Sequence, residues 1–301
     1  MLYPNGDFTM GLSMSVKPHK PPQAAQTRER GNRPQTTYSK RMVRNCVARL
    51  EQQHGKINLA FATYTLPELD EVAMSRLRES WGEVSRQLMQ ALGRDLEAAG
   101  IKPELVYVNE IQEQRYKESG VIAPHIHAVF QSRRNRYAKY AISKERNTEI
   151  WNRVISNVLG HRTEAPSGAS IAQVKKSAEC YMSKYMSKGS EIAQQVQSDG
   201  MNSQLPKSWW GASYTLRRWV KDHIKLFADS SKDYIKNNYR RFQENLQNSP
   251  FSWLYVHNII STEPHMENVE IPVAIVGRVK PEYFNSFEYK QLEDIPMSWN
   301  S

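Results

Sequence analysis

The order in which strand-like and helix-like patterns follow one another constrains the fold more than any other feature of the sequence. Four segments have the length and apolar content of short strands: 57–64, 105–112, 123–130 and 169–174. Between the first two, apolar residues recur every three or four positions from Asp70, which predicts one long helix ending near Gly100. A second helix begins at a Ser143 cap and ends at Gly160, and a third spans about 177–188. The order strand-helix-strand-strand-helix-strand-helix predicts an α+β fold with a central antiparallel sheet flanked by helices.

The two ends of the chain differ in character from this middle part. The first 37 residues include five prolines and few large apolar residues, so we expect a disordered basic arm that either contacts DNA or is a solvated tail. A short basic helix is expected at 39–54, and the polar stretch 115–120 is expected to be part of a long loop. One long helical region is expected at about 214–248, followed by strands at 253–260 and 271–279. The expected parts are therefore the arm 1–37, a main domain 38–225, and a helical and strand-containing extension 226–301.

Composition and charge exclude some classes of protein and favour others. The 301 residues contain Cys46 and Cys180 as their only cysteines, which excludes a disulfide framework and a zinc site of paired cysteines. No apolar run approaches the ~20 residues that cross a bilayer, so we expect no membrane partner and a cytoplasmic location. The net charge of +10 favours polyanionic partners, nucleic acid among them.

A pair of histidines is the first candidate for chemistry. His125 and His127 lie two apart on a predicted strand, so both imidazoles point to one face and can reach one metal ion. Glu110 and Gln112 share one face of the preceding strand, and hairpin pairing would bring that face beside the histidines. Two imidazoles and one oxygen ligand leave positions open for a substrate, as in catalytic metal sites. The alternative interpretation is an incidental histidine pair beside an exposed Glu and Gln.

The helix at 177–188 is the second candidate. Tyr181, Lys184, Tyr185 and Lys188 fall on one stripe of that helix, which places two phenols beside two ammonium groups. Neighbouring cations favour the phenolate and stabilise the charge that builds on a phosphate under attack. The alternative is an amphipathic helix whose tyrosines only pack and whose lysines are solvated.

Aromatic and basic residues elsewhere could bind unpaired bases and phosphates. The first group combines tryptophans with arginines: Trp209, Trp210, Arg217 and Arg218. The second is a basic stretch after the histidine strand: Arg133, Arg134 and Arg136. Core aromatics at a domain junction and an exposed loop without a partner are the alternatives.

Taken together, the motifs resemble the HUH endonucleases, in particular the two-tyrosine branch of bacteriophage gene A-type proteins and plasmid rolling-circle initiators. The resemblance spans about residues 57–220 and includes the Trp209-Trp210-Gly211 segment. It implies a palm-like sheet on which His125 and His127 bind a divalent ion, Mg²⁺ or Mn²⁺, with Glu110 or Gln112 as third ligand. It also implies that Tyr181 and Tyr185 are paired nucleophiles, with Lys184 and Lys188 as neighbouring cations. The segment between Gln112 and His125 is longer than a short turn, which leaves the third ligand open.

The expected function is therefore rolling-circle replication initiation: site-specific nicking and joining of single-stranded DNA through a 5′-phosphotyrosine intermediate. The expected partners are a replication origin and, because the chain has no G-x-x-x-x-G-K-[ST] motif, a host helicase and polymerase. A two-tyrosine single-strand transposase or a relaxase would use the same chemistry. A non-catalytic basic nucleic-acid-binding protein is the alternative from a different class.

Overall fold

A computed structural model describes residues 2–3, 5, 7–11, 37–175, 177–206, 208–223, 229–247, 249–260 and 270–280. The chain divides into two compact units. One unit comprises Gln26–Trp219, and the other combines Met1–Ala25 with Val220–Ser301. No helix within the described residues is long and apolar enough to span a membrane.

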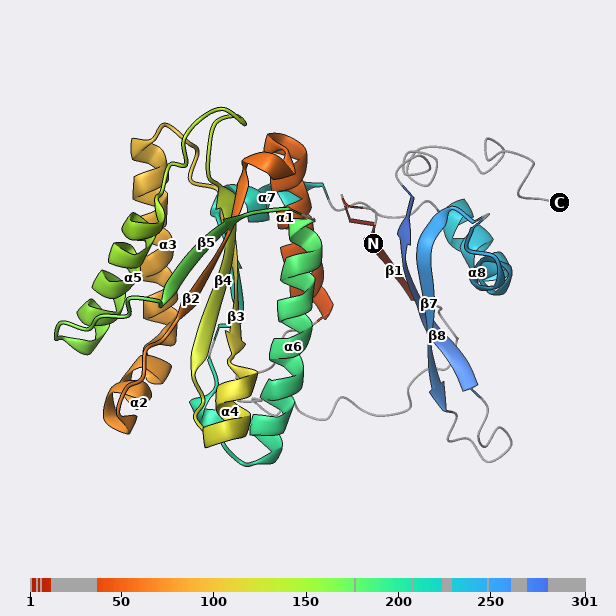
Figure 1. Cartoon of the computed structure of the whole chain (residues 1–301). Coiled ribbons are helices and arrows are strands. Elements are labelled where there is room, and N and C mark those ends of the chain that lie inside the picture. The colour runs from red at the N-terminus through yellow and green to blue at the C-terminus, as the bar shows by residue number, and fades with distance from the viewer. Residues whose placement is uncertain are drawn as a thin grey trace. The chain divides into compact units, whose positions relative to one another are not determined.

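A five-stranded antiparallel sheet forms the centre of the larger unit, in the order β5-β2-β4-β3-β6 (Figure 1). The strands are β2 (Leu59–Thr65), β3 (Leu105–Ile111), β4 (Pro124–Gln131), β5 (Ala169–Gln173) and β6 (Trp210–Ala212). The four strands predicted from the sequence are all present, and β6 is an additional edge strand. The α+β class with a central antiparallel sheet is confirmed.

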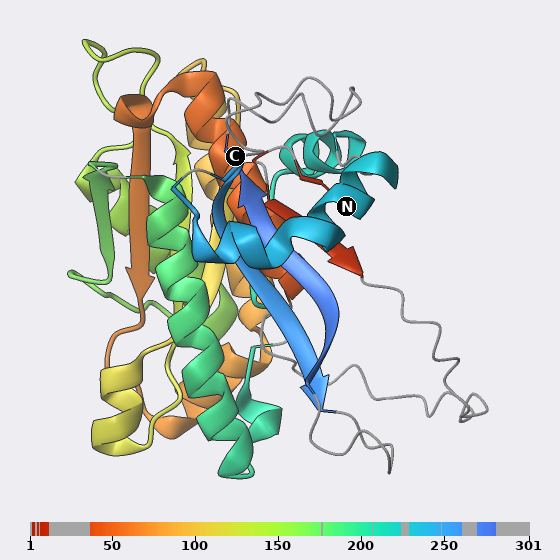
Figure 2. The same ribbon diagram turned by 90° about the vertical axis from the view of Figure 1, so that its right-hand side faces the viewer.

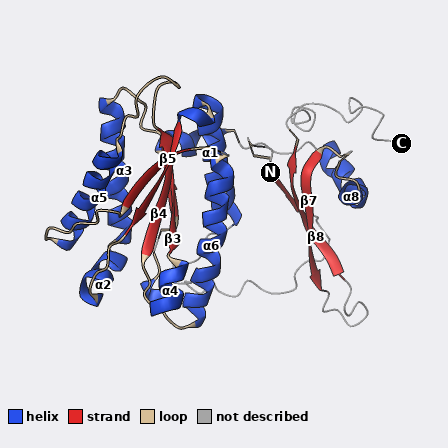
Figure 3. Ribbon diagram, viewed as in Figure 1, coloured by secondary structure: helices blue, strands red, loops and turns tan. Residues whose placement is uncertain are grey.

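Helices cover both faces of this sheet (Figure 3). One face carries α2 (Glu71–Glu79), α3 (Trp81–Ala98) and α5 (Lys144–Leu159), and the other carries α1 (Thr37–His54) and α6 (Ala178–Ser198). Alternate residues of β2, such as Ala60, Ala62 and Tyr64, are buried in one cluster with Trp81 and Trp151 of the first face. The apolar side chains that alternate along the strands therefore pack against the apolar side chains that recur every three or four residues along the helices.

Local capping signals place several helix ends where the sequence predicts them. The Asp70 carboxylate accepts a hydrogen bond from the Ala73 amide at 2.8 Å, and Ser143 accepts one from the Arg146 amide at 3.1 Å. Gly160 ends α5 with a φ of 77°, a left-handed conformation that favours glycine.

Parts of the helical pattern differ from the prediction in detail. The long helix after Asp70 is interrupted at Ser80, which ends α2 and precedes α3, although the apolar spacing continues across it. The expected loop after β3 contains α4 (Glu113–Ser119), a polar helix in which only Tyr116 is buried and which Gly120 ends. The helical region expected at about 214–248 contains two helices, α7 (Tyr214–Asp222) and α8 (Asp229–Glu244).

The smaller unit contains a three-stranded antiparallel sheet, β1-β8-β7, with α8 across it (Figure 2). The predicted strands are confirmed as β7 (Phe251–Ile260) and β8 (Glu270–Val279). The N-terminal arm requires a correction, because Asp7–Gly11 forms β1 and pairs with β8. This pairing partner lies about 270 residues away in the chain, so the local sequence carries no sign of it; residues 12–36 lie outside the described residues.

Candidate metal centre

The register of the central strands assembles the candidate metal centre. In β4, His125 pairs with Glu110 of β3, and His127 is two residues further along the same face. Ligand atoms of these three side chains all lie within 4.8 Å of one another, and Glu110 Oε2 is 2.9 Å from His127 Nε2. His127 is 1% exposed and Glu110 6%, so the group is buried at the floor of the face that carries α6. The group could bind a metal ion.

Two threonines of β2 hold the histidine rings from the other side. Thr63 Oγ1 lies 3.1 Å from His127 Nδ1, and Thr65 Oγ1 lies 2.9 Å from His125 Nε2. These hydroxyls hold the orientation of the rings, as groups behind metal-bound histidines commonly do. Sequence reasoning missed both residues, although their alternation along β2 was visible and places them on one face.

Burial controls the protonation of the group. Desolvation lowers the pKa of His127 to about 3, and desolvation together with the neighbouring His127 lowers that of His125 to about 3. Both imidazoles are therefore neutral at physiological pH and keep a lone pair for a metal ion. Desolvation raises the pKa of Glu110 to about 7, so this carboxylate is on the edge of ionisation near neutrality.

The structure brings Glu110 into the histidine group and places Gln112 beside it. Gln112 follows the end of β3 at the N-cap position of α4, without a capping hydrogen bond from its side chain. It lines an adjoining cleft of about 520 Å³ together with Glu110, His125 and Lys188. The Glu110 carboxylate oxygen lies within 4.8 Å of a ring nitrogen of both histidines, which supports Glu110 as a third ligand.

The tyrosine helix, α6, lies directly over the candidate metal centre. Ser177 caps its first turn, and Met182 and Met186 are buried on the side away from the predicted stripe. The Tyr185 ring stacks on His127, with the ring centroids 3.6 Å apart and the planes at 26°. Tyr181, one turn earlier, packs on Phe61 at 5.5 Å, and Phe61 also stacks on Tyr185.

The sequence suggested that the lysines of α6 lower the pKa of Tyr185, but in the structure this pKa is raised. Desolvation, the Glu110 carboxylate and Tyr181 together raise it. The physical reason is distance and exposure: Lys184 Nζ is exposed and 5.9 Å from the centre of the Tyr185 ring. Lys188 Nζ lies 3.6 Å from Glu113 and lines the adjoining cleft.

The arginines after β4 have structural contacts. Arg133 donates to the Ile57 carbonyl at 2.8 Å, and Arg134 donates to the Ala99 carbonyl at 2.9 Å. Arg136 stacks on the exposed Tyr137 ring, with its guanidinium carbon 4.6 Å from the ring centroid. Arg134 and Arg136 are exposed and Arg133 is half-buried, and a DNA contact stays a prediction for all three.

The tryptophan and arginine candidates divide into buried and accessible residues. Trp209 is 4% exposed and packs in a core with Ile111, so it is not a platform for bases, contrary to the prediction. This burial agrees with the alternative interpretation, a core aromatic. Trp210 is half-buried on β6, whereas Arg217 and Arg218 of α7 are exposed. A DNA contact stays a prediction for these three.

Within the described part of the chain, the buried Glu110 and His127 and the half-buried His125 form a group that could hold a metal ion, and Tyr185 lies against it. This arrangement joins the two motifs that the sequence kept fifty residues apart. The chain matches no family model, no curated protein and no solved structure, so its function is inferred from this site.

Proposed function

We propose that this protein is a metal-dependent endonuclease and strand transferase of the HUH type, which cuts single-stranded DNA with a tyrosine nucleophile. The observation that carries the proposal is the stacking of Tyr185 on His127 at 3.6 Å. A phenol that only packs in a core needs no histidine pair and carboxylate beneath it. Because Tyr185 is in contact with the triad, a phosphate bound at the triad would be close to a nucleophile and to a metal site at once.

The residues of the triad fit a divalent cation. Glu110, His125 and His127 would hold it, and a bound cation would act there as a Lewis acid on a phosphate oxygen. Mg²⁺ prefers oxygen ligands, whereas two imidazoles suit Mn²⁺ at least as well. We therefore expect Mn²⁺ to support cleavage at least as well as Mg²⁺; cleavage with Mg²⁺ and never with Mn²⁺ would contradict this donor set.

The chemistry assigned to the chain's own residues is a transesterification. The Tyr185 oxygen forms a bond to phosphorus while the bond from phosphorus to the 3′-oxygen breaks. The phenol loses its proton and the departing 3′-oxygen gains one, which leaves a 5′-phosphotyrosine and a free 3′-hydroxyl. Because one phosphodiester replaces another, the step reverses without ATP. Glu110 helps to raise the pKa of Tyr185, so ligation of that carboxylate removes one obstacle to ionisation.

Tyr181, one helical turn from Tyr185, would provide a second nucleophile for a second cleavage. The free 3′-hydroxyl would prime synthesis, and Tyr181 would cleave the regenerated site while the Tyr185 bond is resolved. This sequence of steps is rolling-circle replication of a phage or plasmid in a bacterial cytoplasm, with a host helicase and polymerase. A transposase or relaxase would use the same site for a different exchange.

The test is a covalent adduct with a defined polarity. Purified protein and Mn²⁺ are mixed with a single-stranded library of random sequence, labelled at either the 3′ or the 5′ end, and run on a denaturing gel. A 5′-phosphotyrosine retains the 3′-labelled fragment on the protein and releases the 5′-labelled one. We expect Tyr185→Phe and the pair His125→Ala and His127→Ala to abolish or strongly reduce the adduct.

Matched variants separate the site from general damage. Tyr255→Phe removes a phenol that is 59% exposed in the other unit, and His161→Ala removes an exposed histidine. Both should form the adduct as the natural protein does. The absence of any adduct, or an adduct that carries the 5′-labelled fragment, would refute the proposal.

A further inference from the structure

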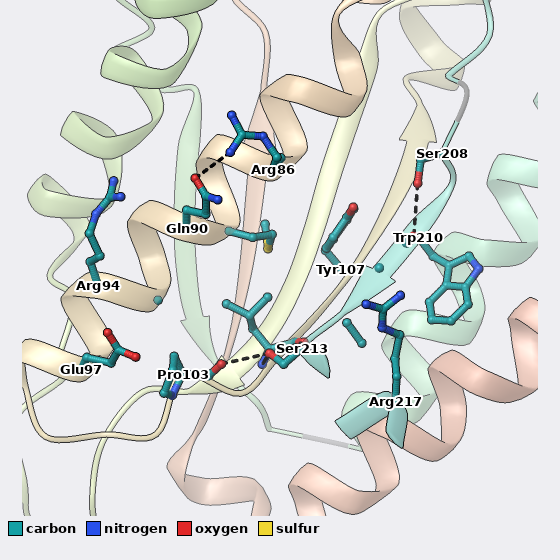
Figure 4. Close-up of a pocket in the computed structure, with 15 residues that line it drawn as sticks. Arg86, Gln90, Arg94, Glu97, Pro103, Tyr107, Ser208, Trp210, Ser213 and Arg217 are labelled. Atoms are coloured by element: carbon teal, nitrogen blue, oxygen red, sulfur yellow. Dashed lines mark hydrogen bonds between the residues drawn. The ribbon is translucent and has the colours of Figure 1, made fainter. Parts of the chain in front are cut away.

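A groove lies on the face of the five-stranded sheet opposite the candidate metal centre. Its volume is about 570 Å³, and it is walled by α3, β3, β6 and the first turns of α7 (Figure 4). Side chains alternate along β3, so Tyr107 of the groove and Glu110 of the triad point to opposite faces. The groove is therefore a separate feature of the molecule, within the range of about 300–1,000 Å³ that is typical of ligand sites.

The floor of the groove is apolar and contains an accessible aromatic ring. The half-buried Tyr107 ring lies against Gly211 of β6, where an added Cβ would overlap the ring. Met89, Pro103 and Leu105 also line the groove. A flat ring among aliphatic side chains is a surface on which another planar ring can stack.

The walls are cationic. Arg86, Gln90 and Arg94 follow one another at four-residue spacing on α3, and Arg217 of α7 lies near Tyr107 in Figure 4. Arg86 is held by Glu83, 2.7 Å from its Nε. Among the residues that the structure describes, Arg94 and Arg217 form no ion pair or hydrogen bond through their side chains.

The charge of Arg217 is not neutralised by the groups that it faces. Burial raises the pKa of the Tyr107 phenol and raises that of the Cys46 thiol to about 12, so both are neutral. The acid that lines the described groove is Glu97, against three arginines. The groove therefore has an excess of positive charge and favours an anion.

A second, smaller groove extends the cationic surface along α3. It has a volume of about 250 Å³ and shares Arg86, Gln90 and Arg94 with the first groove. Its far wall on α5 carries Arg153, whose side chain makes no ion pair or hydrogen bond to any described residue. Cations spread over two adjoining grooves suit a chain of phosphates better than one small anion.

We propose that these grooves bind a segment of single-stranded nucleic acid, with phosphates at Arg94 and Arg217 and a base against Tyr107. A duplex would not serve, because its bases are paired and stacked inside and cannot reach the ring. The choice of DNA as the polymer rests on the proposed function. The grooves would hold a part of the strand distant from the scissile phosphate and add affinity without taking part in cleavage.

The test measures binding without cleavage. Fluorescence anisotropy of a labelled oligothymidylate is followed with the full chain in EDTA over a range of salt concentrations. Arg94→Ala and Arg217→Ala should each weaken binding and reduce the slope of log K against log salt by about 0.7, the value for one phosphate on a single strand. Tyr107→Leu should weaken binding about 5- to 150-fold, whereas Tyr107→Phe keeps the ring and should bind normally.

Arg162→Ala is the matched control, because this arginine side chain is 88% exposed and pairs only with the local Glu164 among described residues. It should leave affinity and slope unchanged. An unchanged affinity and slope in the Arg94→Ala, Arg217→Ala double variant would overturn the proposal, as would equal binding of a duplex with the same dependence on Tyr107. If the grooves bind the oligonucleotide but the protein forms no covalent adduct, only the proposed function is contradicted. If the protein forms the adduct but the groove variants bind the oligonucleotide normally, only the proposal for the grooves is contradicted.

Discussion

Replacing Thr63 by Val tests the metal centre without changing a ligand. Thr63 Oγ1 lies 3.1 Å from His127 Nδ1, while His127 Nε2 faces Glu110 at 2.9 Å. When Nε2 ligates a cation, the ring proton must be on Nδ1, and the Thr63 hydroxyl is the acceptor for it. Valine keeps the shape of the side chain and removes this acceptor.

The size of the effect follows from the burial of His127. The residue is 1% exposed, so water does not readily replace the lost acceptor, and a buried donor without a partner costs about 1–3 kcal/mol. The metal-free protein avoids this cost by moving the proton to Nε2, where Glu110 accepts it. The metal-bound protein cannot, so the cost falls on the bound state. The dissociation constant for Mn²⁺ should rise about 5- to 150-fold.

Titration calorimetry with Mn²⁺, at a pH about one unit above the pKa of Glu110, measures this change. Thr65→Val acts on the more exposed His125 and should have a smaller effect, because water can take the place of the hydroxyl. Thr148→Val is the control: its hydroxyl bonds to a carbonyl in α5, remote from the site. An unchanged affinity of Thr63→Val for Mn²⁺ would refute the argument that Thr63 accepts the Nδ1 proton of metal-bound His127. The absence of Mn²⁺ binding by the natural protein would refute the triad as a metal site.

Three further predictions concern protonation and packing. Burial raises the pKa of Glu110 from 4.5 to about 7, so protons compete with Mn²⁺ for this carboxylate below about pH 7. Calorimetry from about pH 4 upward should show the affinity for Mn²⁺ falling below about pH 7 rather than near pH 4.5. A constant affinity across these pH values would contradict the raised pKa of Glu110. Tyr64→Phe removes the 2.7 Å hydrogen bond from a buried phenol to Asn147 and should lower the free energy of unfolding in urea by about 1–3 kcal/mol. Gly168→Ala places a Cβ within 3.0 Å of three neighbouring atoms and should lower the free energy of unfolding by about 1–3 kcal/mol in the same assay. The control Gly93→Ala meets its nearest atom at 3.5 Å and should not destabilise the protein. Equal effects of the two variants would contradict the tight packing at Gly168.

Helix ends were predictable from the sequence where their chemistry is local. Asp70, Ser143 and Ser177 each accept a hydrogen bond from an amide three residues later, an interaction contained within one turn. The break at Ser80 was not predictable, because the apolar spacing continues through it and no proline marks it. The helix α4 was missed because most of its face is polar and only Tyr116 is buried.

Long-range pairing decided other parts of the fold. Asp7 looks like part of a polar arm, yet it is 1% exposed and pairs with Arg278 at 2.7 Å. For Trp209 the sequence left a base-stacking role and a core role open, and the structure buries it beside Ile111. In both cases the partner is far away in the chain, and local composition gives no information about it.

The sequence by itself determined which side chains share a face. His125 and His127 are two apart on a strand, and Tyr181 and Tyr185 are four apart on a helix, so the periods of strand and helix align each pair. Only the tertiary structure decided that Tyr185 stacks on His127 and that Glu110 comes within reach of both histidines. These relations depend on the register of β3 against β4 and on where α6 crosses the sheet. Register and crossing are set by the packing of the whole core, which no local stretch of sequence specifies.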